Sequence, residues 1–135
     1  MFQTAGTSVH QTTAERDAAT LAIRQPAVIR LLERELTTAD GDAFAAGLEL
    51  ACRVLGGHSP LGDLRLDATA LATGMAAVRS GRCDRAMVRS LRDQLDELPI
   101  VLTLAEQDAV ATVIASVIWA VLDASVRDLD DTLLA

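Results

Sequence analysis

Apolar residues recur along this chain at the three- and four-residue spacing of helices that bury one face. Between residues 26 and 38, for example, Val28, Ile29, Leu32 and Leu36 share one side, and charged residues fall on the other. Similar stripes follow in the later segments. The pattern predicts six helices, over about residues 13–24, 26–38, 42–56, 68–80, 82–98 and 104–133.

The predicted helices are separated by residues that cap or interrupt helices. Thr12 with Glu15, and Thr103 with Glu106, form capping-box patterns, in which a hydroxyl and a carboxylate satisfy each other's free backbone amides. The remaining boundary signals are Pro26, Asp40-Gly41-Asp42, Gly56-Gly57, Asp67, Gly81 and Pro99. Residues 100–102 are all aliphatic, and we expect them to form an extended, buried connector.

The last predicted helix has an unusual middle section. Its apolar run from Ala109 to Leu122 is shorter than the roughly 20 residues that span a membrane. Because this run is apolar on nearly every side, it requires burial on more than one side. We expect it to be the central helix of a bundle or the seam of a dimer. Ala109, Ser116 and Ala120 would let a neighbouring helix approach closely.

Composition favours an aliphatic helical core. Of 135 residues, 50% are hydrophobic and only 2% aromatic, so we expect little or no strand. The sequence predicts an all-α fold: a bundle or orthogonal array of about six helices with a long, largely buried C-terminal helix. Residues 13–135 would form one domain behind a disordered tail over 1–12. The start lacks a signal-peptide pattern, so we expect a cytoplasmic protein.

The net charge of −7 is unevenly distributed. Residues 103–135 carry one Arg against six acids, a charge of −5, whereas residues 67–102 balance five Arg with five acids. This acidity argues against nucleic-acid binding, which depends on neutralising phosphates. The acidic residues Asp128, Asp130 and Asp131 instead suggest a partner surface, and a basic protein is one candidate partner. The other interpretations are that this end frays into solvent or pairs with arginines.

A stripe of arginines is the most concentrated positive feature. Arg82, Arg85, Arg89 and Arg92 follow helical spacing, and Arg79 could extend the stripe across Gly81. Guanidinium groups at this pitch could bind phosphates or a carboxylate-rich partner through paired hydrogen bonds. The alternative is a solvated helix face with local pairs to Asp93 and Asp96.

Trp119 is the only Trp and falls opposite the large aliphatic side of its predicted helix. It shares that side with Thr112, Ser116 and Asp123, so we expect this face to be half exposed or at an interface. Packing of the Trp side chain under a loop is the alternative.

No pattern for a metal, cofactor or nucleophile stands out. His10 and His58 lack the Glu-x-x-His spacing of di-iron bundles, and Cys52 and Cys83 lack zinc-site spacing, so semi-buried thiols are expected. Asp40-Gly41-Asp42 departs from calcium-loop spacing. His58 beside Ser59 is the best catalytic candidate, but a turn residue explains it more simply. The sequence therefore predicts no cofactor and no catalytic residues.

Three functional hypotheses follow from these features. The first is a non-catalytic interaction module that forms a homodimer through the Trp119 face, without binding nucleic acid or membrane. The second is a small-molecule-binding bundle or minor enzyme with an aliphatic pocket, using His58, arginines or the Asp40–Asp42 turn. The third is an acidic inhibitor or immunity-type partner of a basic protein.

Overall fold

The chain folds into helices joined by short connections. A computed structural model describes residues 19–36, 41–56 and 65–134, and the surroundings of side chains as far as residue 124. Within these ranges there is no strand, so the all-α prediction is confirmed. A helical stretch over 19–24 is followed by α2 (Pro26–Leu36), α3 (Asp42–Gly56), α4 (Ala68–Arg79), α5 (Arg85–Glu97) and α6 (Leu104–Leu134). The predicted tail over 1–12, the capping box at Thr12 and most of the loop with His58 lie outside the described residues.

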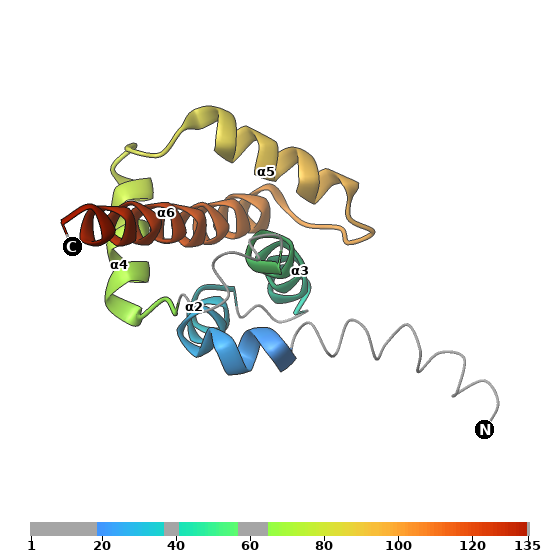
Figure 1. Cartoon of the computed structure of the whole chain (residues 1–135). Coiled ribbons are helices and arrows are strands. Elements are labelled where there is room, and N and C mark those ends of the chain that lie inside the picture. The colour runs from blue at the N-terminus through green and yellow to red at the C-terminus, as the bar shows by residue number, and fades with distance from the viewer. Residues whose placement is uncertain (1–18, 37–40, 57–64, 135) are drawn as a thin grey trace, which may run out of the picture.

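Helix α6 is the central element, as its apolar middle predicts. It contacts α2, α3, α4 and α5, and Figure 1 shows α5 on one side of it, α2 and α3 on the other, and α4 crossing it. Its residues Val110, Val113, Ile114 and Val117 are at most 1% exposed. Among the side chains described, burial decreases after Val121, and Leu122 at the end of the apolar run is 57% exposed.

Local sequence signals explain most helix boundaries. The Asp67 side chain caps α4 by accepting a hydrogen bond from the Ala70 amide, 2.7 Å away. The α6 capping box is present, since the Thr103 amide donates to Glu106 and the Glu106 amide donates to the Thr103 hydroxyl. Gln25 separates the first helical stretch from α2, because Pro26 lacks the amide that would continue the helix.

Helix α5 begins three residues later than predicted. Gly81 ends α4 with a φ of 76°, and the amides of Gly81 and Arg82 donate back to Val78 and Ala77. Asp84 then caps α5 by accepting from the Ala86 amide at 2.9 Å. Arg82 consequently lies in the turn between the helices. The prediction that Arg82 shares a helical stripe with Arg85, Arg89 and Arg92 was therefore wrong.

The aliphatic connector before α6 also differs from the expectation. Ile100 and Leu102 are half-buried against the core, but Val101 is 92% exposed. Extended backbone turns successive side chains to opposite sides, so a three-residue segment on the surface cannot bury all of them. The prediction of a fully buried connector was therefore wrong at its central residue.

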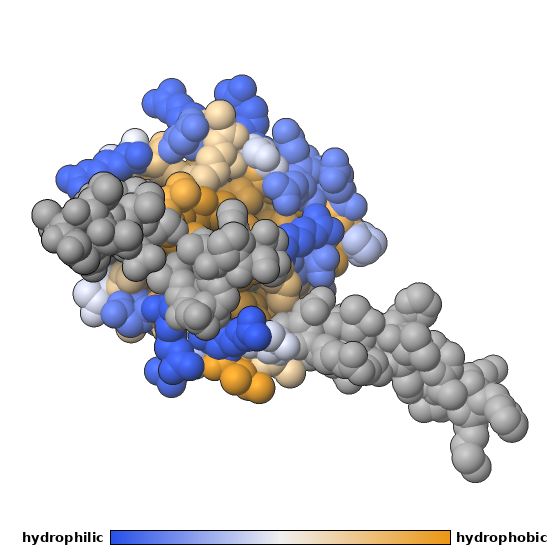
Figure 2. Space-filling view, viewed as in Figure 1, coloured by the Kyte–Doolittle hydropathy of each residue, from blue (hydrophilic) through white to orange (hydrophobic). Residues whose placement is uncertain are grey.

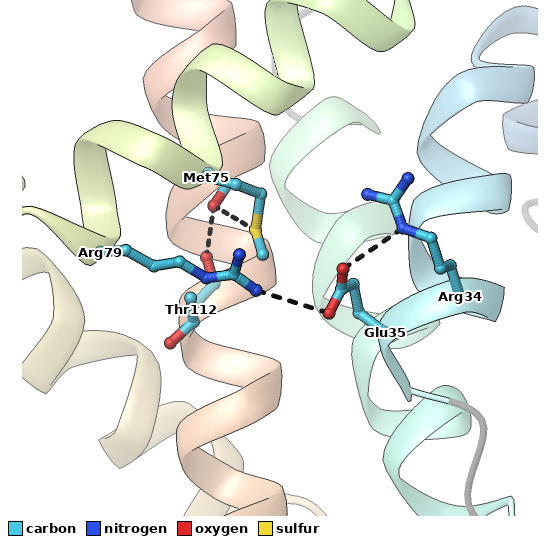
Figure 3. A network of polar contacts seen from close by, with 6 residues as sticks. Arg34, Glu35, Met75, Arg79 and Thr112 are labelled. Atoms are coloured by element: carbon cyan, nitrogen blue, oxygen red, sulfur yellow. Dashed lines mark hydrogen bonds and ion pairs between the residues drawn. The ribbon is translucent and has the colours of Figure 1, made fainter.

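Helices α4 and α6 come close enough for their backbones to meet. Gly74 lies directly over Ser116, so a Cβ atom at residue 74 would be only 2.5 Å from the Ser116 carbonyl oxygen. The Ser116 hydroxyl donates to the Thr112 carbonyl at 2.7 Å and lies 2.9 Å from the Met75 sulfur (Figure 3). The prediction that Ser116 permits close helix approach is thus confirmed.

Candidate functional site

The described surface contains an open groove between the end of α4 and the N-terminal half of α5. Its volume is about 340 Å³. Figure 1 shows that α5 diverges from α6 towards its N-terminal end. We call this feature the Arg groove, and its lining residues are Val78, Gly81, Cys83, Arg85, Val88, Arg89 and Arg92.

The groove combines apolar walls with guanidinium groups. Val78 and Val88 are half-buried and pack on the core, whereas Arg85, Arg89 and Arg92 are exposed. In the space-filling view, hydrophilic side chains gather along the edge formed by α5, and apolar residues show beneath them (Figure 2). Such a surface suits a ligand with both a negative charge and apolar atoms.

The arginines of the predicted stripe have different partners. Arg92 forms an ion pair with Asp108 of α6, not with Asp93 or Asp96, which the alternative interpretation had offered as local partners. Arg79 lies 3.6 Å from Glu35 of α2 and joins the network in Figure 3, so it does not extend the stripe. Among the described residues, Arg85 and Arg89 have no acidic partner within 4 Å.

The electrostatics at the start of α5 favour an anion. The free amides at a helix N-terminus carry a partial positive charge, which acidic residues usually offset. Here the Asp84 cap is followed by Arg85, and the first turn contains no acid. The Asp84 carboxylate offsets part of the positive charge at the helix start, Arg85 adds to that charge, and a bound carboxylate or phosphate would pair with the guanidinium group.

Cys83 is one of the residues that line the Arg groove. Burial raises its pKa, the negative charge of Asp84 adds to this effect, and a backbone hydrogen bond at Asp84 opposes it. A thiol with a raised pKa is a weak nucleophile near neutral pH. Cys83 is thus part of the groove wall, and like Cys52 it is half-buried and forms no disulfide.

The face predicted around Trp119 is divided by the structure. Trp119 and Thr112 are half-buried, and Asp123 is partly exposed. Ser116 is fully buried under α4, so its side chain is not accessible to a second chain and leaves the predicted interface set. Leu122, three residues after Trp119, is an exposed apolar residue. It therefore belongs to the candidate interface, although its place in the apolar run predicted burial.

The backbone of α6 continues through the acidic residues to Leu134 and extends past α4 (Figure 1). The side chains of Asp128, Asp130 and Asp131 lie outside the described surroundings. No basic residue occupies the last turn of the helix. Negative charge at a helix C-terminus is disfavoured by the backbone dipoles, so the acidic residues give this end the locally unfavourable charge.

Metal binding and membrane insertion each depend on features of the described residues. They contain no group of three or more His, Cys, Asp or Glu side chains that could hold a metal ion. The segment Leu104–Ala124 is long and apolar enough to cross a membrane, but half of its most apolar window is buried by the other helices. A core helix shows the same properties, so this is weak evidence for a membrane span.

Known proteins provide no guide to the function of this site. The chain matches no protein-family model, no curated protein and no solved structure. The features of this chain that bear on its function are therefore the groove, the Trp119 face and the acidic end of α6.

Proposed function

We propose that this chain is a non-catalytic helical module that acts by protein association and forms a homodimer. The observation that carries the proposal is the exposed apolar surface on the second half of α6. Trp119 is half-buried and Leu122 is 57% exposed, on a helix that buries all five residues from Val113 to Val117. Covering apolar surface contributes about 25 cal/mol per Å² before the costs of association, and Trp is enriched at binding hot spots.

The proposal places the protein in the cytoplasm, without nucleic acid, membrane or cofactor as a partner. Its net charge of −7 supports the exclusion of nucleic acid, because phosphate neutralisation requires a basic surface. A separate basic protein that binds the acidic residues Asp128, Asp130 and Asp131 is compatible with the same charge distribution, and we keep it as a lesser prediction.

Self-association is tested by light scattering over a dilution series, together with fluorescence of the single Trp. We expect the mass to fall from dimer to monomer on dilution and the Trp119 emission to change with the same midpoint. A monomeric mass at every concentration, with unchanged emission, would refute the homodimer.

A matched pair of substitutions locates the interface. Leu122→Ser removes the exposed apolar side chain beside Trp119. Leu104→Ser removes one that is 80% exposed at the first residue of α6, far from Trp119. We expect Leu122→Ser to weaken the dimer about tenfold or more and Leu104→Ser to leave it unchanged. Equal effects of the two substitutions would contradict an interface at Trp119.

The Arg groove supports a second candidate function, the binding of a small anionic molecule. Its volume of about 340 Å³ is at the lower end of ligand sites, and its walls combine aliphatic residues with guanidinium groups. A thermal-shift screen of carboxylates and phosphates with short apolar tails tests this candidate. No stabilisation by any of these compounds would remove it.

A further inference from the structure

We infer that the Arg groove of one chain binds the acidic end of α6, with Asp128, Asp130 and Asp131, from a second copy. This inference rests on the proposed self-association and specifies the contact that would hold the dimer in register. The groove contains arginines without acidic partners among the described residues, and the acidic end contains three carboxylates near a helix terminus. Each feature supplies the charge that the other lacks.

The geometry of α5 and α6 prevents this pairing within one chain. The two helices run in opposite directions, and Arg92 of α5 contacts Asp108 of α6. At about 1.5 Å per residue, Arg85 lies about 10 Å beyond that contact, whereas Asp128 lies about 30 Å beyond it. The remaining separation of about 20 Å exceeds what two side chains can span, and α5 also diverges from α6 in this direction.

The positions of the two features permit a reciprocal contact between two copies. The turn before α5 and the C-terminal end of α6 lie at the same end of the molecule (Figure 1). A two-fold axis at that end can therefore place each acidic end on the other chain's groove. An isologous dimer requires this arrangement, because the same surface must contain both halves of the complementary pair.

The charged side chains at the two helix ends support the same contact. Arg85 adds positive charge next to the Asp84 cap at the start of α5, and the acidic residues add negative charge near the end of α6. In the proposed dimer the carboxylates approach the positive end of α5 and the guanidinium groups approach the negative end of α6. Exposed ion pairs are individually weak, so Val78 and Val88 in the groove and Leu122 on α6 would add apolar contact.

Charge reversal tests the contact with the full chain. One variant combines Arg85→Glu with Arg89→Glu, and a second combines Asp128→Arg, Asp130→Arg and Asp131→Arg. Arg92 is retained because it pairs with Asp108. The control, Arg24→Glu with Arg30→Glu, makes the same change in net charge as the Arg85 and Arg89 variant, at exposed residues away from the groove.

Sedimentation across a concentration series gives the dimer dissociation constant of each variant. We expect each reversal variant to weaken the homodimer about tenfold or more, and the control to change it less than about threefold. An equimolar mixture of the two reversal variants should form a heterodimer, because both groove contacts are then attractive. Native mass spectrometry with one variant labelled by ¹⁵N detects that heterodimer directly.

The outcomes separate this inference from the function on which it rests. A monomeric wild-type chain would refute both. A wild-type dimer whose reversal variants dimerise as tightly as the control would overturn the groove contact and leave self-association intact. Variants that remain monomeric when mixed would also overturn it, provided that circular dichroism shows native helix content. The neutral pair Arg85→Gln and Arg89→Gln should have an intermediate effect and checks that the fold tolerates changes at these residues.

Discussion

Helices α4 and α5 both pack on α6, but in different ways. At the α4 contact, Gly74 and Ser116 bring the two backbones together, and the buried neighbours Leu71 and Met75 close the space around them. At the α5 contact, a stripe of leucines holds the helices apart, and polar pairs lie along the exposed edge. Small residues thus produce a close crossing, whereas large ones on a diverging helix leave room for the Arg groove.

The attachment of α5 depends on few buried side chains. Leu95 is 1% exposed, whereas Met87 near the start of the same helix is half-buried. We expect Leu95→Ala to reduce the free energy of unfolding by about 2–4 kcal/mol, because it leaves a cavity between α5 and α6. Urea unfolding measures the change. Met87→Ala should cost less, and an equal or larger loss would contradict a weakly held N-terminal half of α5.

The α4 crossing should be sensitive to a single methyl group. In Gly74→Ala the new Cβ meets the Ser116 carbonyl, which is backbone and cannot rotate away. We expect a loss of about 1–3 kcal/mol despite the better helix propensity of Ala. Gly47→Ala is the comparison, since its Cβ would meet only the ends of the Leu36 and Leu32 side chains. Thermal unfolding in which Gly47→Ala is the more damaging substitution would refute the distinction.

The polar edge of α5 should contribute least to stability. Arg92 and Asp108 form an ion pair, but their side chains are 51% and 59% exposed. Solvent screening limits such a pair, so Arg92→Ala should change the free energy of unfolding by less than about 1 kcal/mol. A double-mutant cycle with Asp108→Ala measures the pair itself. A coupling well above that value would show that α5 is held by charge as much as by its leucines.

Much of the fold was predictable because its signals are local. Helical spacing of apolar residues, the Thr103–Glu106 capping box and the Gly81 stop all act within a few residues. The start of α5 was mispredicted because apolar spacing alone does not reveal the turn that Gly81 and Asp84 impose. As a consequence, Arg82 was wrongly included in the helical stripe of arginines.

The candidate site was predictable only in part. The sequence identified Arg85, Arg89 and Arg92, but pairing of Arg79 with Glu35 depends on α2 lying beside α4. The role of Gln25 was missed as well. Its side chain accepts a hydrogen bond from the Leu66 amide at 2.9 Å, across 41 residues, and no local pattern signals such a contact.

The sequence by itself determined that this protein is helical, where most of its helices begin and end, and that the middle of its last helix needs burial on several sides. Only the tertiary structure decided which arginines are already paired, that Ser116 is buried while Leu122 is exposed, and that a groove opens beside α5. The reason is physical: periodicity and capping depend on neighbours along the chain, whereas pairing and burial depend on which helices meet in space.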